Sequence, residues 1–278
     1  MVDTISRPPI ELILRPPFNT TLAEQSHRIG AAIVTMRAET KRPLTLDELA
    51  EVASYSRFHF ARTFRQLTGT TPGAFQTAIR FARASELLLT SSASVTEICG
   101  EVGYSSLGTF SDRFRSLVGV SPSGLRELPQ RIAGLPSTML EDPAMPPTDV
   151  GQTVRILVPE SGPGVPSIYV GLFPDAVASG VPIAGAMTQR PGILFLTGVP
   201  PGSYHLLAVA FPAPIDGLGH LLPGDGVRVS SSGRPIRVSA SLPPGHRSPL
   251  HRLSLRAPAP TDAPILTALP ALVLARMT

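Results

Sequence analysis

Cysteine is nearly absent from this sequence of 278 residues, which contains only Cys99. A single cysteine excludes a disulfide within the chain and any metal site built on a CxxC pair. This composition suits a reducing compartment, and we expect the cytoplasm. Cys99 falls on the apolar side of a predicted short helix, where we expect a buried small residue rather than a reactive thiol. The six histidines form no HExxH pattern, so we expect no metal and no other cofactor.

Long hydrophobic runs are missing as well, because prolines and arginines interrupt each apolar stretch near the C-terminus. No window approaches the ~18 apolar residues of a membrane-spanning helix, and residues 1–17 lack the features of a secretory signal. We therefore expect no export and no membrane partner. Lysine is also scarce, since Lys41 is the only one among 24 basic residues, against 20 acidic residues. The net charge of +4 is too small to indicate a nonspecific coat for nucleic acid, so any such function must rest on motifs.

Proline is common, with 31 residues, but its distribution is uneven and divides the chain. No proline occurs from Arg80 to Val120, whereas five lie between Pro129 and Pro147 among small and polar residues. Such a stretch is typical of an extended spacer between domains. We predict an N-terminal arm over residues 1–22, an all-α domain over 23–128, a linker over 129–150 and an all-β antiparallel sandwich domain over 151–278.

Helix start signals mark the first half of the chain. A hydroxyl residue followed three positions later by glutamate matches the capping box, in which the two side chains satisfy free backbone amides. A hydroxyl residue directly before a proline is a second kind of start, because proline is favourable in a first helical turn. Together with apolar residues at helical spacing, these signals predict about seven helices. The signals are Thr21 with Glu24, Thr45 with Glu48, Ser94 with Glu97, Thr71 with Pro72, and Ser121 with Pro122.

The second half of the chain changes to short apolar runs separated by glycine and proline, which is typical of strands joined by turns. Residues 265–276 are a candidate closing strand. The predicted strands are Val154 to Val158, Ile168 to Phe173, Ile193 to Val199, Tyr204 to Phe211, Val227 to Ser231, Ile236 to Leu242 and Leu253 to Leu255.

The helical half contains the same pattern twice. TLDELAEVASY (Thr45 to Tyr55) resembles SVTEICGEVGY (Ser94 to Tyr104), and FARTFRQLTGTTP (Phe60 to Pro72) resembles FSDRFRSLVGVSP (Phe110 to Pro122), with one extra residue in the second turn. Each copy predicts a capped helix, a polar turn and a second helix in which two phenylalanines four positions apart face the core. The arginines beside them are then exposed, as in helix-turn-helix units that enter a major groove: Arg62, Arg65, Arg113 and Arg115. The alternative is a helical domain that binds a protein or nothing.

At these residues the chain resembles the AraC/XylS family, and the match over residues 23–128 is most specific in VGYSSLGTFSDRFRSLVGVSPSGLRE (Val102 to Glu127). The resemblance implies two helix-turn-helix units joined by a long central helix, double-stranded DNA as partner, and contact with RNA polymerase. The predicted central helix, from Pro72 to about Leu89, would span roughly 27 Å at 1.5 Å per residue, close to the ~34 Å turn of DNA. The family resemblance also implies base-reading positions at Phe58, Ala61 and Arg62.

The same resemblance places neighbouring contacts at Arg57 and His59, and puts Ser106, Thr109, Asp112, Arg113 and Arg115 on the second unit. Asp112 stands where the first unit has Arg62 and where the family commonly has a basic residue. Because aspartate can only accept a hydrogen bond and repels phosphate, we expect the first unit to read most of the sequence.

The second half resembles prealbumin-like or carboxypeptidase-regulatory-like sandwiches over Val170 to Ala208. We expect it to bind a small-molecule effector or a protein partner, or to support dimerisation. We expect no enzyme activity, because the chain has no GxSxG elbow and its Gly-x-Gly segments lack a third glycine. The alternative is a small-molecule carrier or enzyme domain fused to a DNA-binding module.

Overall fold

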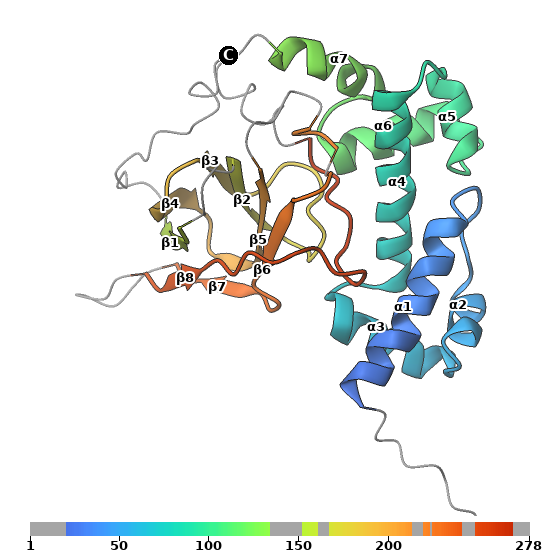
Figure 1. The fold of residues 1–278 in the computed structure, drawn as a ribbon, viewed down its shortest axis with the longest axis horizontal. Helices are drawn as coiled ribbons and strands as arrows, with labels where there is room; N and C mark the ends of the chain where they lie inside the picture. Colours follow the sequence, from blue (N-terminus) through green and yellow to red (C-terminus); the bar gives the residue numbers. More distant parts are fainter. Residues whose placement is uncertain are drawn as a thin grey trace, which may run out of the picture.

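The structure is a computed structural model that describes residues 21–133, 152–160, 167–212, 219–222, 224–240 and 248–268 (Figure 1). The predicted arm before Thr21 and the predicted linker from residue 134 onward therefore lie outside the described residues, as do residues 269–276 of the candidate closing strand. The described part consists of a helical region followed by a sheet-rich region, which confirms the predicted fold class. No helix in this part of the chain is long and apolar enough to cross a membrane.

Seven helices occupy the described part of the first half, as predicted. Two of them start with complete capping boxes, at Thr45 and Ser94, and all seven have the side chain of a serine or threonine accepting a backbone amide. At Thr21 the box is incomplete, because the carboxylate of Glu24 binds Arg28 at 2.8 Å instead. The helices are α1 (Leu22–Ala38), α2 (Leu46–Val52), α3 (Arg57–Thr68), α4 (Pro72–Thr90), α5 (Val95–Glu101), α6 (Leu107–Val118) and α7 (Pro122–Ile132).

Helix α7 extends beyond residue 128, where the sequence predicts that the helical domain ends. Helix α7 continues through Pro129 to Ile132, and Ile132 is buried. Proline removes one backbone donor within a helix, but the burial of Leu128 and Ile132 on either side of it retains the last turn. The first proline of the cluster, Pro129, therefore lies inside α7 rather than after it.

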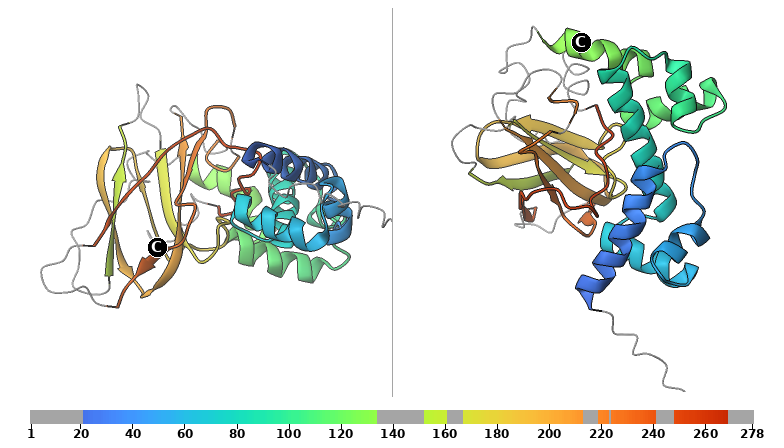
Figure 2. Two further views of the ribbon diagram at one scale, coloured as in Figure 1. Left: turned by 90° about the horizontal axis from the view of Figure 1, so that it is seen from below. Right: turned by 45° about the vertical axis from the view of Figure 1, so that its right-hand side comes forward.

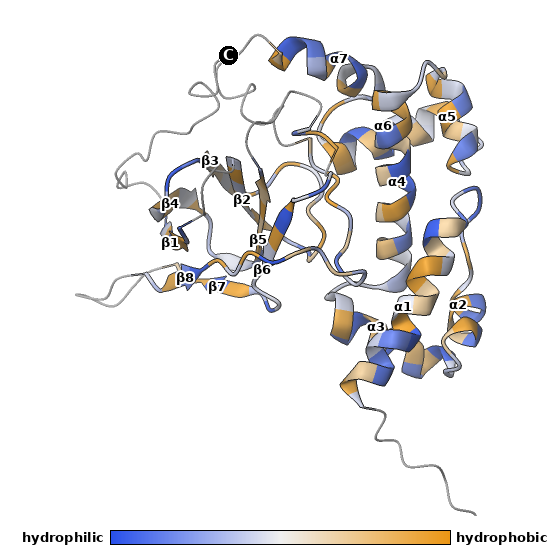
Figure 3. Ribbon diagram, in the orientation of Figure 1, coloured by the Kyte–Doolittle hydropathy of each residue, from blue (hydrophilic) through white to orange (hydrophobic). Residues whose placement is uncertain are grey.

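Helix α4 lies between two hydrophobic cores and belongs to both. Its residues Phe75 and Ile79 pack with α1, α2 and α3, where the largest buried side chains include Phe60 and Phe64. Further along, Phe81 packs with α5, α6 and α7, and its ring stacks on Phe110 with centroids 5.7 Å apart. Figure 3 shows apolar residues on the inner faces of these helices and polar residues outside. The predicted central helix is therefore the shared core of the two repeated units.

Two sheets pack face to face in the second half, which we call the sheet domain. One sheet has the strand order β4-β1-β8, and the other has β3-β2-β5-β6 with β7 also paired to β5. Alternating residues such as Ile156, Leu172 and Leu206 form the core between them. The strands are β1 (Gln152–Val158), β2 (Ser167–Phe173), β3 (Ala184–Thr188), β4 (Gly192–Val199), β5 (Gly202–Phe211), β6 (Arg228–Ser231), β7 (Ile236–Val238) and β8 (Leu250–Arg252).

Several strand predictions need correction. Strand β3 was not predicted, because its sequence AGAMT has no β-branched or aromatic run. The last named strand lies at Leu250–Arg252 rather than at Leu253 to Leu255, and it pairs with β1 in a parallel direction, so the domain is not wholly antiparallel. Residues 265–268 form no strand; the amides of Leu266 and Thr267 instead donate to the carbonyl of Ala178. Strand β7 ends at Val238, earlier than predicted.

The sheet domain packs against the helices through the outer face of its five-stranded sheet (Figure 2). Tyr169, Met187 and Val209 form an apolar cluster on that face. Ile265 packs against this cluster and belongs to residues 256–268, which we call the C-terminal segment. Residues 256–268 run between the sheet and the helices, and Leu266 of this segment belongs to the core around α6. The two halves of the chain therefore share an apolar interface.

Candidate nucleic-acid interface

The two repeated units have the same turn between their helices. In the first turn Ser54 has a positive φ of 54°, and in the second Gly103 has 74°. The amide of the following tyrosine closes each turn on the helix before it, from Tyr55 to the carbonyl of Ala50 and from Tyr104 to that of Cys99, both at 2.9 Å. Both pairs of helices are therefore held by the same backbone geometry, and the sequence repeat is a structural repeat.

An arginine from the preceding long helix holds each turn, and the sequence patterns did not predict this role. Arg80 of α4 donates to the carbonyls of Val102 and Gly103 at 2.8 and 2.9 Å and lies 4.7 Å from the centroid of the Tyr104 ring. Its burial lowers the pKa of the guanidinium. The interaction is partly cation–π and partly charge-assisted hydrogen bonding.

Arg28 of α1 stands in the same relation to the first turn. It donates to the carbonyl of Ser54 at 3.3 Å and lies 5.3 Å from the centroid of the Tyr55 ring. This second arginine is more exposed, and it also forms an ion pair with Glu24. The sequence signal for Arg80 was an arginine set among the buried residues of α4.

Helix α3 has one buried and one exposed face. Phe60, Thr63 and Phe64 are buried in the core. Phe58 is 78% exposed near the start of the helix, although it is a large apolar residue. Every α3 position named from the sequence is at least partly accessible: Arg57, Phe58, His59, Ala61, Arg62 and Arg65. None of the predicted contact positions on this helix is therefore buried.

Arg62 is supported by a neighbouring imidazole. Its Nη2 lies 3.3 Å from Nδ1 of the half-buried His59, whose ring packs edge-on against Tyr55 with centroids 4.4 Å apart. The guanidinium of Arg57 lies 5.3 Å from the centroid of the Phe58 ring and 3.9 Å from a carboxylate oxygen of Asp47. The accessible surface of α3 thus includes guanidinium, imidazole and exposed phenyl groups.

Helix α6 presents the matching surface with different chemistry. Ser106 caps the helix, and its Oγ accepts from the amide and the hydroxyl of Thr109 at 3.3 and 3.2 Å. Asp112, Arg113 and Arg115 are all exposed. Within the described part of the chain, neither arginine comes within ion-pair distance of Asp112. The carboxylate at this position is therefore presented to solvent rather than neutralised by its neighbours.

The C-terminal ends of both second helices contact the sheet domain. The amide of Gly180, between β2 and β3, donates to the carbonyl of Leu117 at 2.5 Å, and that of Ala268 donates to Val118 at 2.9 Å. At the end of α3, Gly69 has a φ of 75°, and a Cβ there would lie 2.8 Å from the Cβ of Ala176. The sheet domain thus supports α3 and α6 from one end and leaves their predicted contact residues exposed.

A family model described as a helix-turn-helix domain matches residues 49–128. A transcriptional regulator of Haemophilus influenzae is 34% identical over 134 residues, which are 46% of this chain and 45% of that protein. The Escherichia coli activator RclR is 34% identical over 106 residues, or 38% of this chain and 37% of that protein. Residues 49–128 form an AraC/XylS-type helix-turn-helix domain.

Two solved structures are each similar to a little over a third of the chain. A transcriptional regulator with an AraC-type DNA-binding domain from Chromobacterium violaceum is 31% identical, covers 37% of this chain and 93% of its own, and has a TM-score of 0.36. The DNA-binding domain of AdpA, solved with a target DNA, is 30% identical, covers 38% and 98%, and has a TM-score of 0.35. The matched region spans less than half the length of the two regulators named above.

Outside the AraC-type domain, the likeness of the sheet domain to prealbumin-like or carboxypeptidase-regulatory-like sandwiches stays a prediction. Cys99 is buried as expected, and burial raises the pKa of its thiol. Among the residues that the structure describes, no three His, Cys, Asp or Glu side chains lie close enough to hold a metal ion.

Proposed function

We propose that this chain is a sequence-specific DNA-binding transcription regulator that places α3 and α6 in successive segments of the major groove. The observation that carries this proposal is the structural repeat, in which the second helix of each unit buries two phenylalanines and exposes polar and basic residues. Helix α4 joins the units with 19 residues, or about 28 Å at 1.5 Å per residue. That length suits two adjacent turns of the groove on one face of DNA.

The two units differ in charge, and this difference assigns their roles. Arg62 can form a bidentate contact with guanine or hold a phosphate, whereas Asp112 can only accept, for instance from a cytosine amine. Nδ1 of His59 lies 3.3 Å from Nη2 of Arg62 and orients the guanidinium, which favours a directed contact with a base. We therefore propose that α3 reads most of the sequence and α6 mainly positions the protein.

The remaining parts of the proposal concern the rest of the chain. The protein acts in the cytoplasm by binding rather than by catalysis, and contact with RNA polymerase follows from regulation of transcription. The sheet domain serves as the effector or interaction module. Its direct backbone contacts with the end of α6 support this role, because they connect it to the DNA-binding surface.

Salt dependence of DNA binding tests the proposed function. For a mixed-sequence duplex, the logarithm of the binding constant should fall linearly with that of the salt concentration, because arginines release counterions from phosphates. Replacing Arg62 and Arg65 together by alanine should weaken binding and flatten this slope. Arg83→Ala is the matched control, since Arg83 is an exposed arginine on α4 that pairs with Glu86. Absence of binding, or equal effects of the double variant and the control, would contradict the proposal.

A further inference from the structure

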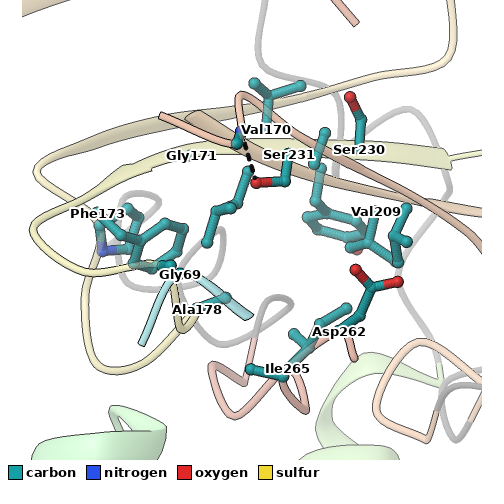
Figure 4. A pocket seen from close by; sticks show the side chains of 18 of the residues that line it. Gly69, Val170, Gly171, Phe173, Ala178, Val209, Ser230, Ser231, Asp262 and Ile265 are labelled. Atoms are coloured by element: carbon teal, nitrogen blue, oxygen red, sulfur yellow. Dashed lines mark hydrogen bonds between the residues drawn. The ribbon is translucent and has the colours of Figure 1, made fainter. Parts of the chain in front are cut away.

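A cavity of about 420 Å³ lies between the sheet domain and the end of α3 (Figure 4). Its floor is the outer face of the five-stranded sheet, including Tyr169, Leu207 and Val209. The opposite wall consists of residues 66–69 at the end of α3 and of the C-terminal segment around Ile265. The volume falls within the range of roughly 300–1,000 Å³ that small-molecule sites occupy.

The lining of this cavity is mostly apolar. Among the described residues that line it, only Arg256 and Asp262 are charged, and their two hydrogen bonds are 2.6 and 2.7 Å long. Burial alone would raise the pKa of the Asp262 carboxyl, but hydrogen bonds from Arg256 and from the amide of Ala259 lower it overall. The two charges therefore neutralise each other. A charged ligand would have to break this ion pair or have its own charge buried without a partner, and either costs free energy.

A few polar groups interrupt the apolar lining. The hydroxyls of Ser231 and Thr261 and the side-chain amide of Gln66 lie at the wall, and Ser231 Oγ already accepts from the amide of Gly233 at 3.1 Å. A small number of fixed polar groups in an apolar cavity orients a ligand without requiring it to be charged.

We propose that this cavity binds a neutral, mostly apolar small molecule, and that its occupancy alters DNA binding through α3. The second part rests on the proposed function. The physical connection is short, because Thr68 Oγ1 donates to the carbonyl of Phe64 at 2.8 Å and to that of Thr70 at 3.1 Å. A ligand that contacts residues 66–69 thus touches the end of the same helix that carries Arg62.

The test uses two fluorescent probes of similar shape on the full chain: neutral N-phenylnaphthylamine and its anionic counterpart anilinonaphthalene sulfonate. Two variants fill the cavity from its floor, Ser231→Trp and Leu207→Trp, which are cross-strand partners on β6 and β5. The matched control is Ser203→Trp, at an exposed position of β5 outside the cavity. Circular dichroism checks that each variant keeps the wild-type fold.

The neutral probe should bind wild type and Ser203→Trp at one saturable site, and binding to either cavity variant should be at least about tenfold weaker. On wild type, the anionic probe should bind at least about tenfold more weakly than the neutral probe. Saturating neutral probe should change the affinity of wild type for duplex DNA and leave that of Ser231→Trp unchanged. No saturable binding, or equal binding to folded Ser231→Trp, would overturn the site.

The two proposals fail in different ways. Probe binding that leaves wild-type DNA affinity unchanged would overturn the connection to α3 but not the ligand site. A chain that binds the probe at this cavity and binds no DNA at any salt concentration would refute the proposed function, while the ligand site would stand.

Discussion

The arginine that holds the second turn gives a prediction that can be worked out from distances. Arg80→Met keeps much of the apolar length of the side chain and removes the guanidinium. The carbonyls of Val102 and Gly103 then lose donors at 2.8 and 2.9 Å, and the ring of Tyr104 loses its cation at 4.7 Å. Val102 is buried, so water replaces its lost donor poorly, whereas the half-buried Gly103 can be solvated.

The expected loss of stability follows from these contacts. A hydrogen bond to a charged donor contributes about 1.5–3 kcal/mol, and a desolvated cation–π contact contributes up to ~2 kcal/mol. Removing a buried charge recovers part of its desolvation cost, which the lowered pKa of Arg80 reflects. We therefore expect Arg80→Met to reduce the free energy of unfolding of the helical domain by about 2–4 kcal/mol.

Arg28→Met is the matched control, because Arg28 makes the same type of contacts in a more exposed setting, with a single 3.3 Å hydrogen bond to the first turn. We expect it to cost at most about 1 kcal/mol. The two variants are compared by urea unfolding, followed through the helical circular dichroism signal. The comparison requires that the free energy of unfolding depends on urea concentration with the same slope in both. If Arg80→Met costs no more than Arg28→Met, the second turn does not depend on this guanidinium and our account of it is wrong.

Three further predictions concern the recognition helices, the turns and the C-terminal segment. On a preferred DNA site, Arg62→Ala should cost about 1–3 kcal/mol and relax one or two base pairs, while Asp112→Ala is neutral or tightens binding; larger damage from Asp112→Ala would invert the roles. In thermal unfolding, Gly103→Ala should destabilise the protein by about 2–5 kcal/mol, because a Cβ there would clash with the backbone carbonyl of Lys41. Ser54→Gly should instead stabilise it by under ~1 kcal/mol, because Ser54 has a positive φ that glycine adopts more readily. The folded-state pKa of Asp262 is lowered, so its ion pair stabilises above the ordinary value of 3.8 and is lost as pH falls through the folded value. The difference in unfolding temperature between wild type and Asp262→Asn should therefore shrink only below that ordinary value.

The sequence predicted the helical half well because its signals are local. Each cap depends on a hydroxyl residue next to its own helix, and the paired phenylalanines of α3 and α6 repeat at helical spacing. The sheet half was harder, because register and direction depend on partners far away in the chain. Strand β3 has few strand-forming residues and is specified by its pairing with β2. Strand β8 pairs in parallel with β1, although almost the whole sequence of the domain separates the two strands.

The exposure of the proposed contact residues was predictable from the sequence, but their surroundings were not. The repeat indicated that Arg62 is exposed, yet the support from His59 requires the bend of the turn that brings Tyr55 against the imidazole. The cavity could not be predicted at all, because its walls come from α3, the sheet and the C-terminal segment, which meet only in the folded chain.

Selection of bound duplexes from random DNA by the full-length protein tests the central claim most directly. Two recognition helices joined by α4 should enrich a site in two blocks, with centres about one helical turn or 10–10.5 base pairs apart. The block read by α3 should carry the stronger base preference, and Arg62→Ala should weaken that block alone. Absence of any enriched sequence, or a single block that Arg62→Ala leaves unchanged, would contradict the account.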